Sequence, residues 1–137
     1  MSQRDPENHG EGAARVTRLT RRADFQRAAR GARWRGKAFT LQARRREEGD
    51  EALGPRVGFT ATRKIGGAVE RNRIRRRLKE AMRRAGNLEA KADHDYVLVA
   101  QRETLTRRFV ALCADLTEAF AAVHAKSSKR SSDREDP

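Results

Sequence analysis

The sequence has few of the residues and patterns on which disulfides, membrane spans and secretion depend. Its 137 residues include one cysteine, Cys113, so an internal disulfide is excluded. Cys113 falls on the apolar side of an expected helix, which favours a small buried side chain over a nucleophile. No apolar run approaches the roughly 20 residues of a membrane span, and the N-terminal segment MSQRDPENHGEG has no apolar signal core. We therefore expect a cytoplasmic protein that does not enter membranes.

Catalytic and metal-binding patterns are missing as well. The three histidines are far apart and have no ligand-like spacing with cysteine or with paired acids. There is no Gly-x-Ser-x-Gly motif and no phosphate loop of the Walker type. The acidic residues gather in the tails and in residues 47–51, so a pair of metal ions held by carboxylates is hard to build. The sequence predicts no catalytic residue, no metal site and no cofactor bound by the protein itself.

Positive charge, in contrast, is abundant. Lysine and arginine number 32 against 19 acidic residues, which gives a net charge of +13 and a pI near 11.3. Such a surplus points to a nucleic acid as partner, ahead of an anionic membrane. The length is that of one domain, which we place at residues 16–125. The polar ends, residues 1–15 and 126–137, lack hydrophobic periodicity and are predicted to be disordered.

The densest cationic stretch is residues 63–85, RKIGGAVERNRIRRRLKEAMRRA, and its composition predicts a helix. At 100° per residue, one stripe holds Ile74, Leu78, Ala81, Met82 and Ala85. The opposite side holds Asn72, Arg73, Arg76, Arg77, Lys79, Arg83 and Arg84. Only Glu70 and Glu80 can balance these cations, which indicates a polyanion-binding surface rather than an ordinary soluble face. Free amides at Gly66-Gly67 could also receive a phosphate.

Two expected strands carry a second polar surface. Residues 34–45 and a strand after Pro55 alternate between apolar and polar side chains. If these strands are hairpin neighbours, one face holds Thr40, Gln42, Arg44, Thr60, Thr62 and Lys64. A preceding helix, near residues 21–30 with Thr20 as its cap, would place Phe25 above this face, where its ring could stack a base. The alternative is a solvated sheet face with Phe25 in the core.

The second half of the chain predicts a β-α-β unit and a final helix. Residues 96–100, YVLVA, form a continuous apolar run typical of a strand that is buried on both faces and pairs in parallel. A helix from about residue 104 or 106 has an apolar stripe that completes the core. The order is therefore α-β-β(-β)-α-β-α, with a short extra strand possible near residues 33–35.

Residues 59–81, FTATRKIGGAVERNRIRRRLKEA, resemble the signature of the bacterial ribonuclease P protein component. Its mark is an Arg-Asn-Arg segment on a basic helix that follows a strand ending in Lys or Arg. Three groups occur here in order and at fixed spacing: RKIG at 63–66, AV at 68–69 and RNRI at 71–74. The resemblance extends from ADFQ in the first helix to the final helix, about residues 17–124.

The resemblance implies an α+β fold, a small α/β sandwich of the ribosomal protein S5 domain 2-like type with the order α-β-β-β-α-β-α. It implies a left-handed β-α-β crossover, where general preference would predict a right-handed one. It also implies an RNA-binding subunit that joins ribonuclease P RNA one to one and takes precursor tRNA, whose 5′ leader is removed. The catalytic site and its Mg²⁺ would be held by the RNA partner.

The resemblance also assigns site residues by position. Contact with the catalytic RNA would be made by Arg71, Asn72, Arg73, Arg75, Arg76 and Arg77. A cleft for the single-stranded leader would be lined by Phe25, Gln42, Thr60, Thr62, Arg63 and Lys64. Ala29 and Gln42 stand where many relatives have aromatic residues, so we expect leader binding to depend on Phe25 and on backbone charge. The alternative function is a general RNA-binding or ribosome-associated module without a catalytic RNA.

Overall fold

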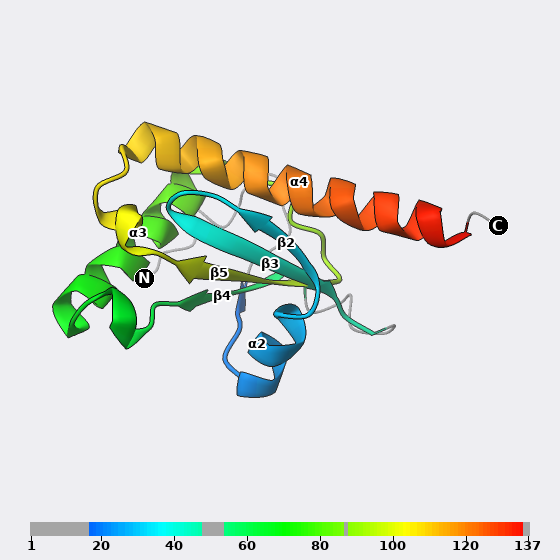
Figure 1. Ribbon diagram of the computed structural model, residues 1–137, viewed down its shortest axis with the longest axis horizontal. Helices are drawn as coiled ribbons and strands as arrows, with labels where there is room; N and C mark the ends of the chain where they lie inside the picture. Colours follow the sequence, from blue (N-terminus) through cyan, green and yellow to red (C-terminus); the bar gives the residue numbers. More distant parts are fainter. Residues whose placement is uncertain (1–16, 48–53, 87, 136–137) are drawn as a thin grey trace, which may run out of the picture.

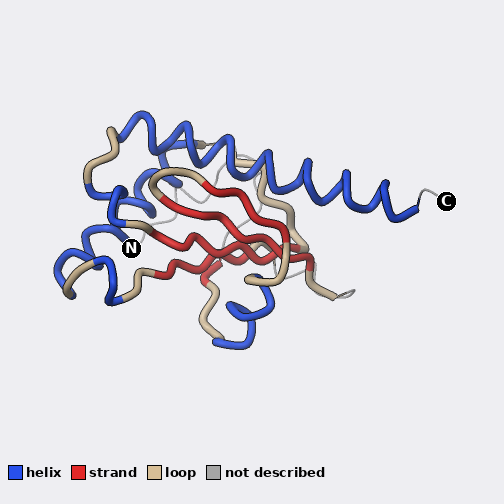
Figure 2. Tube along the Cα trace, in the orientation of Figure 1, coloured by secondary structure: helices blue, strands red, loops and turns tan. Residues whose placement is uncertain are grey.

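The protein forms a five-stranded sheet with helices on both of its faces (Figures 1 and 2). The computed structural model describes residues 17–47, 54–86 and 88–135, with side chains described as far as residue 125. The elements are β1 (Thr17–Arg18), α2 (Arg22–Ala28), β2 (Ala32–Arg35), β3 (Phe39–Arg45), β4 (Arg56–Thr60), the 3-10 turn η2 (Arg63–Ile65), α3 (Ala68–Ala85), β5 (His94–Ala100), the 3-10 turn η3 (Arg102–Leu105) and α4 (Phe109–Glu135). This is the predicted α+β class.

Strand β5 lies at the centre of the sheet, whose order is β1-β4-β5-β3-β2. It pairs in parallel with β4, as predicted, and antiparallel with β3. The supposition that β3 and β4 are hairpin neighbours is therefore wrong. The apolar side chains of β5 need cover on both faces of the sheet, and its backbone needs a hydrogen-bonded strand on each side. Only a central position in the sheet meets both needs.

The two faces of the sheet are covered unequally. Helices α3 and α4 pack on one face and bury the main core, whereas the short helix α2 lies on the other (Figure 1). Of the predicted stripe on α3, Ile74, Leu78 and Ala81 are fully buried, and Met82 and Ala85 are half-buried. On the α2 side the buried cluster consists only of Leu19, Ala28 and Val97, with Phe25 and Val99 packed against it.

Several element ends differ from those predicted. Helix α2 starts after Arg21, whose side chain forms no cap, so Thr20 is not the capping residue. The predicted strand over residues 34–45 is two strands, β2 and β3, so the short extra strand is present. Helix α4 continues to Glu135, whereas the sequence predicts a disordered tail from residue 126. The predicted tail at residues 1–15 lies outside the described residues. None of the helices in the described part of the chain is long and apolar enough to span a bilayer.

A cluster of polar aromatic side chains is buried between β5 and α4. The hydroxyl of Tyr96 accepts a hydrogen bond from the Lys91 amide at 2.8 Å and lies 2.6 Å from Nε2 of His124. The ring of His94 contacts that of His124 edge-on, with 4.8 Å between their centroids. Burial lowers the pKa of His94, and burial together with the neighbouring His94 lowers the pKa of His124 to about 4.

These two histidines predict a loss of stability in mild acid. In the unfolded chain they bind protons near pH 6.5, but the folded protein resists protonation, so stability falls as the pH drops below that value. Between pH 7.5 and pH 5.0, His124 alone accounts for about 1–2 kcal/mol of the free energy of unfolding. Urea denaturation at the two pH values measures this difference, and His124→Gln should reduce it. Equal stability of the wild-type protein at both values would contradict this assignment.

Candidate nucleic-acid interface

The outer side of α3 presents an uneven set of cations. Arg73 and Arg76 are exposed, and in the described residues neither side chain forms a hydrogen bond or an ion pair. Further along the helix, Glu80 accepts from Arg83 at 2.7 Å and from Arg84 at 2.8 Å. Arg83, and then Arg84, holds the pKa of Glu80 below its usual value, so this carboxylate is ionised and partly neutralises the end of the helix. The uncompensated positive charge is therefore concentrated in the first half of α3.

Arg77 differs from its neighbours because its guanidinium is used within the protein. It donates to the carbonyl oxygen of Thr104 at 3.0 Å and to that of Arg107, and it lies over the Phe109 ring at 5.7 Å from the centroid. These contacts join α3 to η3 and to the start of α4. Arg77 thus joins these elements within the protein, although the resemblance assigns it to the contact with the catalytic RNA.

The remaining predicted contacts lie near the start of α3. Arg75 donates to the side-chain oxygen of Asn72 at 3.1 Å, and both are on the outer side of the helix. Arg71 is half-buried and donates to the carbonyl of Gly66 at 3.3 Å, so it lies at the helix entrance. Among the predicted set, Arg73 and Arg76 are the side chains most available to an RNA phosphate.

At the N-terminus of α3, the carboxylate of Glu70 occupies the position where an external anion could bind. Oε1 of Glu70 accepts from the amide of Gly67 at 3.2 Å, and Arg102 donates to both oxygens of Glu70. Arg102 also donates to the carbonyl of Ile65 at 2.7 Å. The hydrogen bond from Arg102 lowers the pKa of Glu70 more than any other contact does. Any phosphate at the Gly66-Gly67 turn would therefore compete with this carboxylate.

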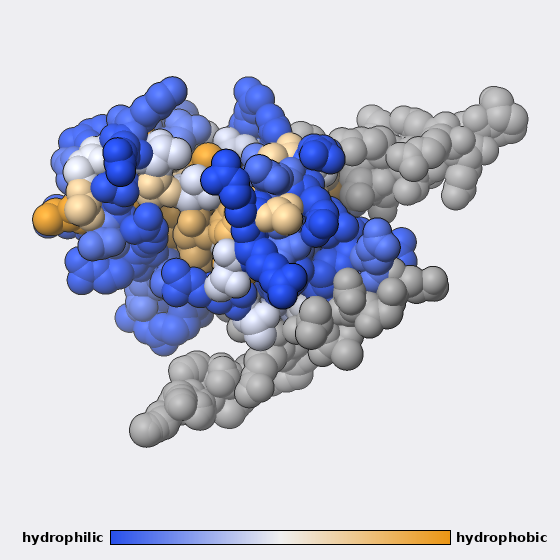
Figure 3. Space-filling view, turned by 90° about the horizontal axis from the view of Figure 1, so that it is seen from below, coloured by the Kyte–Doolittle hydropathy of each residue, from blue (hydrophilic) through white to orange (hydrophobic). Residues whose placement is uncertain are grey.

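On the α2 side of the sheet, four of the six residues predicted to share a face do share it, although β5 separates their strands. These are Thr40, Gln42, Arg44 and Thr60, whereas Thr62 and Lys64 lie beyond the end of β4. Thr40, Val99 and Thr60 form one cross-strand row, and Gln42, Val97 and Gly58 form the next. Seen from this side, the surface is largely hydrophilic around a small hydrophobic area (Figure 3). The contribution of β5 was missed because a continuous apolar run does not show which of its residues stay accessible, and Val99 is half-buried here.

Phe25 lies directly on the sheet at Gly58. A Cβ atom at this glycine would come within 2.6 Å of Cε1 and Cζ of the Phe25 ring, so the ring can approach the strand only because no side chain is present. Phe25 is half-buried, which makes it part of the small α2 cluster and of the surface at once. The two interpretations of Phe25, core residue and surface aromatic, are therefore compatible.

Thr62, Arg63 and Lys64 follow β4 and connect the two regions. All three are exposed, and the turn η2 that contains Arg63 and Lys64 leads from the end of the sheet to the start of α3. The structure brings Phe25, Gln42 and Thr60 onto one face of the sheet. Thr62, Arg63 and Lys64 lie beyond the end of β4. Among residues with described positions, no three His, Cys, Asp or Glu side chains gather as a metal site would require.

Comparison with known proteins identifies the family. The Ribonuclease P family model matches residues 14–124. The chain belongs to the ribonuclease P protein family. It is 45% identical over 108 residues to the ribonuclease P protein component of Caulobacter vibrioides, covering 79% of this chain and 71% of that protein. It is 39% identical over 129 residues to that of Brucella suis, covering 89% and 92%.

Solved structures agree with the family in fold. The ribonuclease P protein from Thermotoga maritima superposes with a TM-score of 0.61 at 25% identity, over 75% of this chain and 94% of that one. The Staphylococcus aureus RNase P protein superposes with a TM-score of 0.60 over 78% of this chain and 94% of that one. At 22% identity, this similarity shows a common fold and nothing more. As a family member, the chain has the role of the protein component of ribonuclease P, a ribonucleoprotein of tRNA processing.

Adjacent arginines on α3 provide a matched test of the basic surface. Arg76→Ala should weaken RNA binding and reduce the dependence of log K on log salt by ~0.7–0.9, because one phosphate contact is lost, with little change in stability. Arg77→Ala should instead lower the free energy of unfolding by about 1–3 kcal/mol, because it removes hydrogen bonds to two backbone carbonyls. Filter binding over a salt series and urea denaturation measure the two effects. Equal behaviour of the two variants would contradict the division of roles.

Gly58 provides a second test. Gly58→Ala should displace the Phe25 ring and lower the free energy of unfolding by about 1–3 kcal/mol through overpacking. The loss should be smaller in a Phe25→Ala background, where the ring is absent. A loss at Gly58 that does not depend on Phe25 would show that the close approach is unimportant.

Proposed function

We propose that this protein binds the catalytic RNA of ribonuclease P one to one in the cytoplasm and assists the removal of the 5′ leader from precursor tRNA. In this proposal the bond is broken in the RNA subunit, which holds the Mg²⁺, and the protein binds no cofactor itself. The observation that carries the proposal is the family match over residues 14–124, which includes both the basic side of α3 and the α2 face.

The basic side of α3 is the proposed contact with the catalytic RNA. Arg73 and Arg76 are exposed cations whose side chains form no hydrogen bond or ion pair in the described residues, and Asn72 beside them can donate and accept hydrogen bonds. Folded RNA offers a dense array of phosphates whose counterions are released on binding. The Arg-Asn-Arg segment would then fix the register of the helix on the RNA.

The α2 face is the proposed site of the leader. A single-stranded nucleic acid needs an aromatic surface for its bases and cations for its backbone. Phe25 provides the first, and Arg63 and Lys64 at the end of the sheet provide the second. Thr60 and Gln42 lie on the same face and add hydrogen-bonding groups. Because Ala29 and Gln42 supply no aromatic ring, binding should depend weakly on leader sequence.

Reconstitution tests the proposal. Adding the protein to a cognate ribonuclease P RNA at low Mg²⁺ should increase the rate of precursor-tRNA cleavage. The increase should shrink as Mg²⁺ is raised, because the ion then replaces part of the charge neutralisation. An Arg73→Ala, Arg76→Ala double variant should need more protein for the same rate. If the wild-type protein binds RNA but leaves cleavage unchanged, a general RNA-binding module is the better description.

A further inference from the structure

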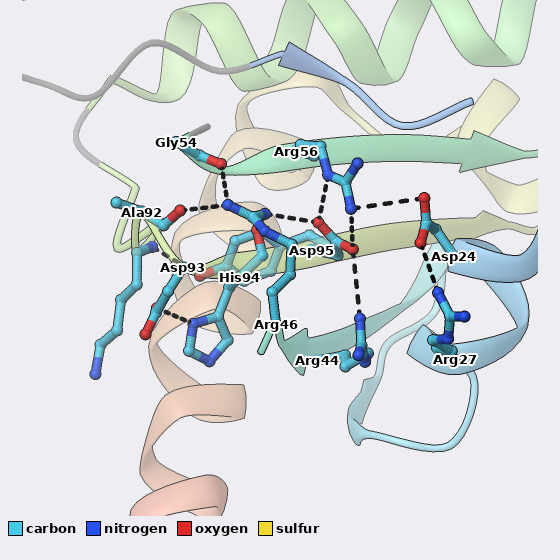
Figure 4. Close-up of polar contacts among 12 residues, drawn as sticks. Asp24, Arg27, Arg44, Arg46, Gly54, Arg56, Ala92, Asp93, His94 and Asp95 are labelled. Atoms are coloured by element: carbon cyan, nitrogen blue, oxygen red, sulfur yellow. Dashed lines mark hydrogen bonds and ion pairs between the residues drawn. The ribbon is translucent and has the colours of Figure 1, made fainter. Parts of the chain in front are cut away.

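A chain of ion pairs connects α2 to the centre of the sheet (Figure 4). Asp24, on α2, lies 3.5 Å from the guanidinium of Arg56 on β4. The same guanidinium donates to both oxygens of Asp95 on β5, each at 2.8 Å. Arg56 therefore bridges two carboxylates, one on the helix and one on the central strand.

The sheet end of this chain is rigidly held. Asp95 is completely buried and also accepts from Arg46 at 2.7 Å. Arg46 in turn donates to the backbone carbonyls of His94, Gly54 and Ala92 at 2.7–2.9 Å. Asp95 thus fixes the position of the Arg56 guanidinium, and that guanidinium is the fixed point to which Asp24 is attached.

The helix end, in contrast, has little else to hold it. Helix α2 has seven residues, and isolated helices of that length are unstable in water. The apolar cluster beneath it is small: Leu19, Ala28 and Val97 are buried, and Phe25 and Val99 pack against them. Asp24 is 6% exposed and is the one acidic residue between positions 17 and 46, a region that contains eleven cations. The ion pair is therefore a major determinant of where α2 lies.

Asp24 directly precedes Phe25, so its position sets that of the ring above Gly58. We propose that Asp24 is a positioning residue for the leader site, acting through Arg56 to hold α2 and the Phe25 ring at the correct height over the sheet. This inference rests on the proposed function of the α2 face. In this role Asp24 would not itself touch the RNA, and its charge is opposite to that of a polyanion-binding group.

The sign of the charge makes the inference testable. Asp24→Asn removes a negative charge from a cationic region, so electrostatics alone would strengthen RNA binding. Loss of the positioning contact should do the reverse. Arg56 keeps its bidentate pair with Asp95, so the substitution leaves no buried cation without a counterion.

The experiment uses the reconstituted holoenzyme and two precursor tRNAs that differ only in the leader, one with several nucleotides and one with a single nucleotide. The wild-type holoenzyme should favour the longer leader in KM by roughly fivefold or more, as expected for a stacked base. With Asp24→Asn this preference should fall by about threefold or more, because the stacking part is lost while Arg63 and Lys64 are unmoved. For the single-nucleotide leader, kcat and KM should change less than about twofold, because that substrate should not reach the α2 face.

Asp115→Asn is the matched control. Asp115, on α4, is 9% exposed and pairs with Arg107 at 2.7 Å, so the chemical change and the burial are nearly the same. This variant should keep the leader preference. Arg56→Lys is a second probe, since an ammonium cannot bridge both carboxylates in the manner of a guanidinium, and it should lose the preference as Asp24→Asn does.

The outcomes distinguish a failure of the positioning role from a failure of the proposed function. If Asp24→Asn retains or increases the leader preference, the positioning role is wrong and the proposed function is unaffected. If both Asp variants lose it equally, the effect is general destabilisation and the positioning role is again wrong. If the wild-type protein raises cleavage of neither substrate, the proposed function fails and the role of Asp24 fails with it.

Discussion

Strand β5 has to be covered on both faces, and the rest of the structure follows from that constraint. Its apolar side chains place it at the centre of the sheet, with α3 and α4 on one face and α2 on the other. The first pair of helices buries most of the core. The seven-residue α2 covers its face only in part, which leaves an accessible surface of threonines, an amide and a half-buried aromatic ring. The need to cover β5 thus produces two different layers, the α3–α4 layer on one face of the sheet and the partly open α2 face on the other.

The internal ion pairs determine which of the many cations remain available. Arg46 and Arg56 are committed to the buried carboxylate of Asp95, and Arg77 is committed to backbone carbonyls. Glu80 engages Arg83 and Arg84 at the far end of α3. On α3 and the turn before it, the exposed cations that form no ion pair in the described residues include Arg73, Arg76, Arg63 and Lys64, and other exposed cations lie on α2 and near β2. The net charge of the sequence therefore overstates the number of cations available to RNA. Which cations remain available depends on where the acidic side chains lie.

Much of the fold could be predicted from the sequence because the hydrophobic periods are clear. The α3 stripe follows from helical spacing, and the parallel pairing of β5 with β4 follows from the β-α-β order of the elements. The place of β5 between β3 and β4 could not be deduced, because alternation fixes the face of a strand but not its neighbours. The shared polar face survived this error, since the cross-strand rows stay in register through β5.

Within the candidate site, the sequence predicted which residues are charged and roughly where they lie. It did not predict which of them are engaged by contacts within the protein. The cationic side of α3 was evident, yet helical angles cannot show that Arg77 turns toward η3 while Arg76 stays exposed. Glu70 was noted as one of few acids, but its position at the Gly67 amide depends on Arg102, which is far away in sequence. The link between Asp24 and Asp95 joins three elements through Arg56, and local patterns do not reveal such contacts.

Site-directed photocrosslinking tests most directly whether the two faces hold two different RNAs. In a Cys113→Ala background, a photoreactive group is attached at Gln26→Cys on α2 or at Lys79→Cys on α3, both exposed positions. In the complete complex, the group at position 26 should label the leader of the precursor tRNA, and the group at position 79 should label ribonuclease P RNA. Labelling of the same RNA from both positions would contradict the account.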